Sequence, residues 1–391
     1  MKKSVCILNI LLFSVLVDAQ DVFSIWNQVI MNNLTLQAAQ QQCSVQKIDT
    51  RVGLMPINPE VEFAYLWGTP TAVGNRVDIS VTQTFEFPTV YVYRHRIADL
   101  QAQKAEFAYL EQQRELLLQV GKLYYEIVYQ NVRIHDMEHC LQILTKIVAA
   151  YQQQLEKGTI SIFEYNKVKL AELNLQQEKA HAEAEYENML LELKQLNGGK
   201  EIAVVNDHFS EFVLPSDFEE WFKQVTDQHP TLLWLNKEEQ FQEQQVKLSK
   251  SMWAPQFVAG YMREQIPSET FQGLKVGLSL PLWNNANSVK KAKLQRSATH
   301  LMAIDQQQKI YNELKKHYLM IEKLQQQIAD YQQLIETVDA TELLSKALDS
   351  GQISLVDYLF ELSMYHESHE RLAEIQRDVA QHYVVLQLWE H

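Results

Sequence analysis

Apolar and polar residues alternate with a period of two in four short stretches of the chain. Segments 61–67 and 77–87 carry Val, Ile, Phe, Tyr or Trp at nearly every second position. Segments 257–265 and 274–282 repeat the alternation, the first of them weakly. Successive side chains of a strand point to opposite faces, so each stretch predicts a strand with one apolar and one more polar face. We expect the four strands to form two hairpins.

A seven-residue period replaces this alternation between residues 90 and 157. One glycine, Gly121, and no proline falls in this segment, which predicts a helix on the order of 100 Å long. Residues 289–350 repeat the pattern and predict a second long helix. Apolar positions seven residues apart, with a second set three residues later, are typical of a coiled-coil seam. In the first helix these positions are Val120, Ile127, Ile134, Leu141, Val148 and Leu155, followed by Leu123, Met137, Leu144 and Tyr151.

Shorter helices are expected around these two. Each long helix is followed by a turn and a returning helix, over 162–196 and 355–389. The Gln- and Ala-rich segment 24–50 favours an additional helix at the start. A short capped helix is expected near 216–222, and another helix begins at Pro230.

Two segments of the chain occur twice at the same spacing. Gly158-Thr-Ile-Ser-Ile-Phe-Glu-Tyr165 matches Gly351-Gln-Ile-Ser-Leu-Val-Asp-Tyr358, 193 positions later. Phe85-Glu-Phe-Pro88 matches Leu278-Ser-Leu-Pro281 at the same offset. A self-match at one fixed spacing indicates a duplicated structural unit. The unit reads strand, strand, long helix, turn, helix.

The start of the chain and the segment between the two copies of the unit lie outside the duplication. Residues 1–19 combine Lys2 and Lys3, an apolar run and a small residue at Ala19, which predicts a secretory signal peptide. We assign residues 20–196 to the first repeat, 197–228 to a connecting segment and 229–391 to the second repeat. The alternation fits a transmembrane barrel or a small soluble sheet with one hydrated face. In a barrel, four strands cannot close, because at least about eight are needed, so several chains would have to share one.

Composition and motifs argue against other kinds of function. The net charge of −14 argues against a nucleic-acid-binding surface. Neither a phosphate-binding glycine loop nor a nucleophile elbow occurs, so we expect no enzyme and no cofactor. Two histidine pairs, His135 with His139 and His366 with His369, lack a third ligand nearby in sequence, and we predict no metal site. We also expect the two cysteines that follow the signal peptide, Cys43 and Cys140, to be unpaired thiols.

The duplicated strand-strand-helix order and the paired Gly-x-Ile-Ser turns resemble the TolC family of outer-membrane efflux channels. The resemblance covers essentially the whole chain after residue 19. It implies a mainly α protein in which three chains close one twelve-stranded membrane β-barrel above a helical tunnel in the periplasm. Segment 56–63 (Pro-Ile-Asn-Pro-Glu-Val-Glu-Phe) is similar to the start of the first strand in the family's heavy-metal-efflux branch.

The resemblance also implies sites at the two turns. The turns would dock a periplasmic adaptor protein, and threefold symmetry would convert Asp357 and Glu164 into carboxylate rings at the periplasmic gate. The alternative is that both acids are solvated residues in the first turn of a helix. An arginine that some members carry near the turn glycine is replaced by isoleucine in both copies. The docking residues would be Gly158, Ile160, Ser161, Tyr165, Gly351, Ile353, Ser354 and Tyr358.

The expected function is therefore transport. The resemblance implies a homotrimer in outer-membrane lipid that serves as the passive exit duct of a tripartite efflux pump for small molecules or metal cations. Its partners would be the adaptor and an inner-membrane transporter of the RND type. One alternative is the exit duct of a type I peptide or protein secretion system. A second, of another class, is a secreted coiled-coil structural or interaction protein.

Overall fold

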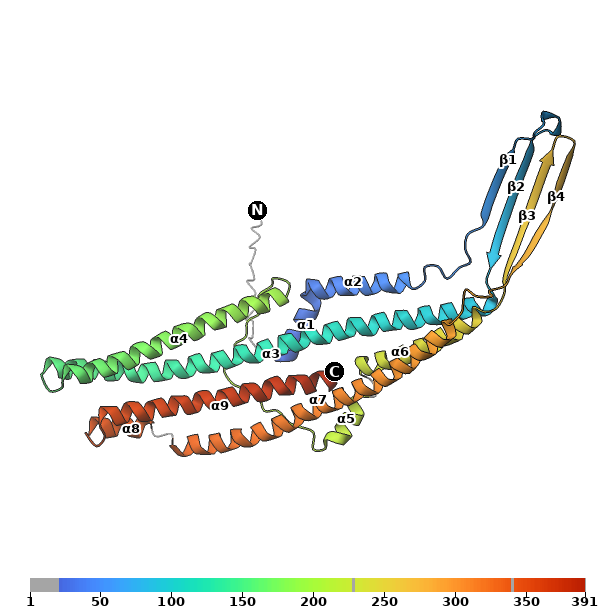
Figure 1. The fold of residues 1–391 in the computed structure, drawn as a ribbon. Helices are drawn as coiled ribbons and strands as arrows, with labels where there is room; N and C mark the ends of the chain where they lie inside the picture. Colours follow the sequence, from blue (N-terminus) through green and yellow to red (C-terminus); the bar gives the residue numbers. More distant parts are fainter. Residues whose placement is uncertain (1–20, 227–228, 339–340, 391) are drawn as a thin grey trace, which may run out of the picture. The chain divides into compact units, whose positions relative to one another are not determined.

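A computed structural model describes residues 21–226, 229–338 and 341–390. The predicted signal peptide, 1–19, lies outside these ranges. Most of the described chain is helical, and four strands form one small sheet (Figure 1). None of the described helices combines the length and apolar character that crossing a membrane requires.

The first half of the chain contains the two expected strands and the expected long and returning helices, with two helices at its start. The elements are α1 (Val22–Asn32), α2 (Leu34–Asp49), β1 (Glu60–Leu66), the short 3-10 helix η1 (Thr71–Val73), β2 (Arg76–Phe85), α3 (Pro88–Glu156) and α4 (Ile162–Leu196). The bounds of α3 and α4 agree closely with the expected helices, because the stretch between Pro88 and the Gly158 turn contains no other strong helix breaker.

The second half repeats strands and long helices in the same order. Its elements are α5 (Phe218–Thr226), α6 (Pro230–Ser251), β3 (Gln256–Ile266), β4 (Glu269–Ser279), α7 (Ser288–Val338), α8 (Thr341–Asp349) and α9 (Leu355–Glu390). One helix was expected over 289–350. The structure describes α7 and α8 instead, and the two residues between them, 339–340, lie outside the described ranges.

The expectation of one helix over 24–50 is wrong, because Asn33 separates α1 from α2. Asn33 has an extended backbone, with φ −65° and ψ 117°. Its buried side chain donates a hydrogen bond from Nδ2 to the carbonyl oxygen of Leu196, 2.7 Å away. This contact spans 163 positions and was not visible in the local sequence pattern.

Strand β4 begins earlier than the alternation indicated, at Glu269 rather than Leu274. The register pairs Ile266 directly with Glu269, so only Pro267 and Ser268 form the turn of this hairpin. The β3 backbone therefore pairs with residues 269–273, although these residues, polar apart from Phe271 and Gly273, hide the strand in the sequence.

All neighbouring strands are antiparallel, in the order β1-β2-β3-β4. The central pair, β2 with β3, joins strands from the two halves of the chain. Val81 lies opposite Tyr261, and Phe85 lies opposite Phe257. Strands β1 and β4 form the two edges of the sheet.

The chain divides into two compact units. One comprises the described residues up to 33 together with 116–214 and 317–388; the other comprises 34–115, 215–316 and 389–390. The sheet belongs to the second unit. Helix α3 contributes residues to both.

The first unit has two apolar cores. In the first core, α1 packs against the middle of α3 and against α4 and α9, and the Cβ of an alanine at Gly121 would lie 2.7 Å from Val384 Cγ1. The second core lies near the helix turns and joins α3, α4 and α9. Its buried members are Cys140, Leu144, Ile147, Val148, Val168, Leu355, Tyr358 and Leu362.

Candidate functional site

One face of the sheet carries apolar residues on all four strands, although the register also places Gln83, Arg263, Gln265, Thr270 and Gln272 on it. The register places Phe63 opposite Ile79, Val81 opposite Tyr261, and Tyr261 opposite Leu274. Because side chains alternate along each strand, the apolar residues of neighbouring strands meet on the same side. The face contains Val61, Phe63, Tyr65, Val77, Ile79, Val81, Phe85, Phe257, Ala259, Tyr261, Leu274, Val276 and Leu278.

This apolar face is exposed in the single chain. Leu274 is 86% exposed, Val276 84% and Val61 71%. Soluble monomers rarely expose a contiguous apolar patch of this kind, and such patches mark contacts with membranes or other proteins.

The opposite face carries polar and charged side chains. Arg76 forms ion pairs with Asp78 at 2.8 Å and with Glu264 at 3.1 Å. Ser80 lies opposite both Glu62 and Met262, and Lys275 lies opposite Gly260. One apolar and one hydrated face is the pattern of a transmembrane barrel strand, although a small soluble sheet alternates in the same way.

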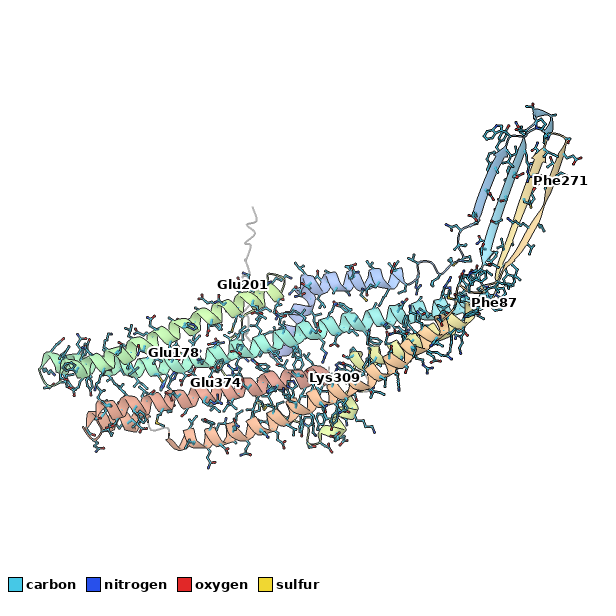
Figure 2. The ribbon with its side chains drawn as sticks, viewed as in Figure 1. Phe87, Glu178, Glu201, Phe271, Lys309 and Glu374 are labelled. Atoms are coloured by element: carbon cyan, nitrogen blue, oxygen red, sulfur yellow. The ribbon has the colours of Figure 1, made fainter. Side chains whose placement is uncertain are left out.

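Aromatic residues gather near the strand ends. At the end of β1, the rings of Tyr65 and Trp67 meet edge to face, with centroids 5.5 Å apart. At the end of the sheet where β3 begins and β4 finishes, Trp253 and Trp283 are 44% and 73% exposed. The exposed ring of Phe271 lies on β4 near its turn (Figure 2). Aromatic girdles at both borders of an apolar band are typical of strands in the outer membrane.

The turn between α3 and α4 is built on Gly158. Its φ of 73° is left-handed, as the sequence predicted. The N–H groups of Gly158 and Thr159 donate to the carbonyl oxygens of Leu155 and Gln154 at 2.9 and 3.0 Å, which closes the helix end. Glycine adopts this conformation without the steric strain that other residues meet there.

Helix α4 then begins with a reciprocal cap. The Ser161 hydroxyl accepts a hydrogen bond from Glu164 N–H at 3.3 Å, and Glu164 Oε2 accepts from Ser161 N–H at 2.8 Å. These contacts form a capping box, which satisfies two otherwise unpaired backbone donors. Ile160 is half-buried, and Tyr165 packs against the core of α3, α4 and α9.

The turn before α9 has the same construction. Gly351 has φ 71°, and the N–H groups of Gly351 and Gln352 donate back to the end of α8 at 3.0 and 2.8 Å. Ser354 donates its hydroxyl to Asp357 Oδ2 at 2.6 Å, and Asp357 N–H donates to the Ser354 hydroxyl at 3.2 Å. Tyr358 is 1% exposed, and Ile353 packs against the same core.

The two predicted gate carboxylates therefore serve as helix caps in the single chain. The backbone N–H of Ser161 holds the pKa of Glu164 below its ordinary value. A capped, solvated acid in the first turn of a helix is the alternative that the sequence left open, and the geometry is compatible with it. A ring requires symmetry copies, so the gate remains a prediction.

The structure also brings together a group that sequence reasoning missed. Asp136 and Cys140 of α3 lie beside His366 of α9, with ligand atoms all within 4.8 Å of one another. Of the two histidine pairs noted in the sequence, His135 and His139 are exposed and do not belong to this group, whereas His366 of the second pair does. Asp136 and Cys140 are spaced i and i+4, which places them on one helix face, but nothing in the sequence indicated His366 as their neighbour.

Several solved structures are similar to this chain in fold. The chain resembles CusC, a protein whose structures concern transmembrane channel formation, with TM-score 0.78, 15% identity and coverage of 95% of this chain and 92% of CusC. It resembles the Campylobacter jejuni outer membrane channel CmeC with TM-score 0.74, 14% identity and coverage of 94% and 85%. For the Neisseria gonorrhoeae outer membrane channel MtrE in its open state, the TM-score is 0.73, the identity 12% and the coverage 94% and 88%.

No protein-family model and no curated protein sequence matches the chain. The chain has the fold of these outer-membrane channels over nearly its whole length. The resemblance to the TolC family that the sequence indicated is thus confirmed at the level of the fold.

Proposed function

We propose that this protein is an outer-membrane channel of the TolC family and the passive exit duct of a tripartite efflux pump. The observation that carries the proposal is the exposed apolar face of a four-stranded sheet with two open edges. The fold of the solved outer-membrane channels supports the same conclusion.

In this proposal three chains close one barrel. Strands β1 and β4 each have only one neighbour in the sheet, so each presents unpaired backbone N–H and C=O groups. Such groups cannot remain unpaired in lipid. Pairing β4 of one chain with β1 of the next satisfies them, and three copies supply twelve strands. The apolar face then contacts lipid, and the polar face lines the pore.

The long helices would form the periplasmic tunnel below this barrel, and the duplicated unit would place two helix turns per chain at its tip. The turns around Gly158 and Gly351 would dock the adaptor, which connects the duct to an RND-type transporter in the inner membrane. Asp357 and Glu164 would form carboxylate rings at the gate, which favour cations. Small molecules or metal cations are the proposed cargo.

The location is tested by fractionation. An inserted barrel should remain with outer membranes after an alkaline carbonate wash, whereas a secreted coiled-coil protein should be released. Recovery of the chain in the wash would contradict the proposal. Export of a reporter peptide, rather than of small solutes, would favour the type I secretion duct over the efflux duct.

The edge pairing is tested by disulfide crosslinking. The background variant is Cys43→Ser with Cys140→Ser, so that introduced cysteines are the only ones after the signal peptide. Cysteines scanned along β1 and β4 should form disulfides between chains, giving covalent dimers and trimers at one register.

The control is a pair on neighbouring strands of one chain, Ser80→Cys with Met262→Cys, which lie opposite each other in the β2–β3 register. This pair should crosslink within the chain and leave the mass on a denaturing gel unchanged. The shared barrel would be contradicted if the control pair formed its disulfide while no β1–β4 cysteine pair gave a crosslink between chains.

A further inference from the structure

A compact group of side chains of metal-ligating types lies in the first unit, among its packed helices. Asp136 and Cys140 project from one face of α3, and His366 projects toward them from α9. The side chains of Asp136 and His366 are 18% and 15% exposed, and Cys140 is 1% exposed. Oxygen, sulfur and nitrogen donors from two helices therefore converge at one place.

The contacts within the group are close. His366 Nδ1 lies 2.6 Å from Asp136 Oδ2, and the Cys140 sulfur lies within 4.8 Å of ligand atoms of both residues. His369, three residues along α9, has its Nδ1 3.9 Å from Asp136 Oδ1. The Nε2 atoms of both histidines are buried and have no hydrogen-bond partner among the residues that the structure describes. Buried polar atoms without a partner are uncommon in folded proteins and call for an explanation.

A neighbouring acidic group is already paired with a cation. Glu178 of α4 (Figure 2) and Glu370 of α9 also lie near His366. Arg133 approaches both carboxylates, with nitrogen–oxygen distances of 3.2 Å to Glu178 and 2.7 Å to Glu370. This second group is thus explained as an ion-pair network, whereas the cysteine-containing group has no arginine or lysine paired with it in the described contacts.

We propose that Asp136, Cys140 and His366 form a binding site for a divalent cation of the Zn²⁺ class that joins α3 to α9. Cysteine sulfur, histidine nitrogen and aspartate oxygen are all ligands of Zn²⁺. A purely thiophilic ion such as Cu⁺ prefers cysteine and methionine, and Mg²⁺ or Ca²⁺ prefers oxygen alone, so the mixed set favours Zn²⁺. His369 lies outside this group of three, so the fourth ligand of a tetrahedral site would come from elsewhere, such as a water molecule.

The geometry needs only a small adjustment to accept the ion. Tetrahedral zinc with bonds of about 2.1 Å keeps its nitrogen and oxygen ligands about 3.4 Å apart. The direct contact between His366 and Asp136 must therefore open slightly on binding. Metal ligands must be deprotonated, so the ion competes with protons for the site. The charged and titratable groups facing His366 are Asp136, Cys140, His369, Glu178, Glu370 and Arg133.

The burial of Cys140 indicates a resident ion with a structural role. Cys140 belongs to the apolar core of α3, α4 and α9, so the ion would fix α3 and α9 against each other beside the helix turns. This inference concerns metal binding by the folded chain and does not depend on the proposed channel function.

The experiment titrates the purified full chain in detergent with Co²⁺, which replaces Zn²⁺ and reports its ligands by absorption. We expect one Co²⁺ per chain, a near-ultraviolet band from thiolate-to-cobalt charge transfer, and loss of the band when Zn²⁺ is added. Cys140→Ser should abolish the band, and His366→Gln should lower Co²⁺ affinity at least about tenfold.

Cys43→Ser is the matched control, because Cys43 is the other buried free thiol of the described chain and lies in the second unit. It should leave the band and the affinity unchanged. Excess Zn²⁺ should raise the melting temperature of the wild-type protein and of Cys43→Ser, but not that of Cys140→Ser.

Two results would overturn the proposal. One is the absence of a thiolate band in the wild-type chain. The other is wild-type Co²⁺ affinity in both Cys140→Ser and His366→Gln, with circular dichroism showing that the variants are folded. Either result would leave Asp136 and His366 as an ion pair beside an inert thiol.

Discussion

At the scale of single residues, a buried titratable side chain makes the stability of this fold depend on pH. This side chain is His229. It is 4% exposed, and it caps α6 by accepting a hydrogen bond from Thr231 N–H at Nδ1, 3.3 Å away. Its ring stacks on Trp389 with centroids 3.5 Å apart. Burial lowers the pKa of His229 to about 4.

This shift predicts acid sensitivity with a defined sign. The folded pKa lies below the ordinary value of 6.5, so folding favours the neutral ring. The contribution to stability is fully present above about pH 6.5 and is lost as pH falls toward 4. It amounts to about 3 kcal/mol. His229→Asn keeps a capping acceptor but does not titrate, so its melting temperature should depend less on pH in this window.

Melting curves in detergent at pH 7 and pH 4.5 check this prediction. The exposed His181 provides the matched control, and His181→Asn should keep the wild-type pH dependence. Equal pH dependence in His229→Asn and in the wild-type protein would show that other groups cause the acid sensitivity.

At Gly351 the left-handed backbone conformation, rather than the packing of neighbouring atoms, limits which residues can replace glycine. Its φ is 71°, and a Cβ at this position would meet no atom within 4 Å. Valine should therefore cost at least about 1 kcal/mol through backbone strain alone. We expect Gly351→Val to weaken crosslinking to the adaptor and to reduce efflux, while insertion into the outer membrane is unchanged.

Gly351→Asn is the control for this substitution, because asparagine tolerates the left-handed conformation better than valine does. It should retain adaptor crosslinking. Wild-type crosslinking of Gly351→Val would contradict the assignment of this turn to docking.

At the scale of elements, the seven-residue pattern of α3 identifies part of the buried face but not its width. Val120 and Ile127 are fully buried, and Ile134 and Leu141 are half-buried. Between residues 120 and 130, several tyrosines outside the seam are also buried, because α1 packs there. The sequence pattern within α3 shows the period of its buried face. The width of that face depends on how many helices pack against α3, and these come from distant parts of the sequence.

Ile134 tests the helix seam. Ile134→Asp should destabilise the protein by about 3 kcal/mol, because the carboxylate loses hydration without gaining a partner. The next residue, His135, is exposed, and His135→Asp should change stability little. Thermal melting of both variants in detergent measures the difference. Equal melting temperatures would show that position 134 does not contribute to helix packing.

The sequence predicted much of the fold because its signals were local. The long helices, the returning helices and the alternation of the strands all came from periodicity and from turn glycines. The break at Asn33 escaped because it rests on a hydrogen bond to Leu196. The early start of β4 escaped because its pairing with β3, rather than its own side chains, determines it.

The candidate sites were predictable to different degrees. The conformations of Gly158 and Gly351 followed from their places at helix ends. The capping contacts of Glu164 and Asp357 were compatible with the sequence, but the group of Asp136, Cys140 and His366 was not visible there. Residues 136 and 366 are 230 positions apart, and only the packing of α3 against α9 brings them together.

At the scale of the whole molecule, the proposed gate depends on symmetry. In a trimer, Asp357 and Glu164 would each occur three times around the pore. Asp357→Asn with Glu164→Gln should lower cation selectivity and the block by divalent cations without abolishing conduction. Planar-bilayer recording measures both quantities. Wild-type selectivity and block in the double variant would show that the two acids act only as helix caps.

The central claim is that three chains close one barrel, and the mass of the detergent-solubilised protein tests it most directly. Four strands per chain leave two open edges, and in lipid these edges must be paired. Light scattering during size-exclusion chromatography, corrected for detergent, should give three times the mass of the mature chain, which is the full-length mass of 45.6 kDa less the predicted signal peptide. Circular dichroism should show that β-structure is retained. A monodisperse monomer with intact β-structure would contradict the account.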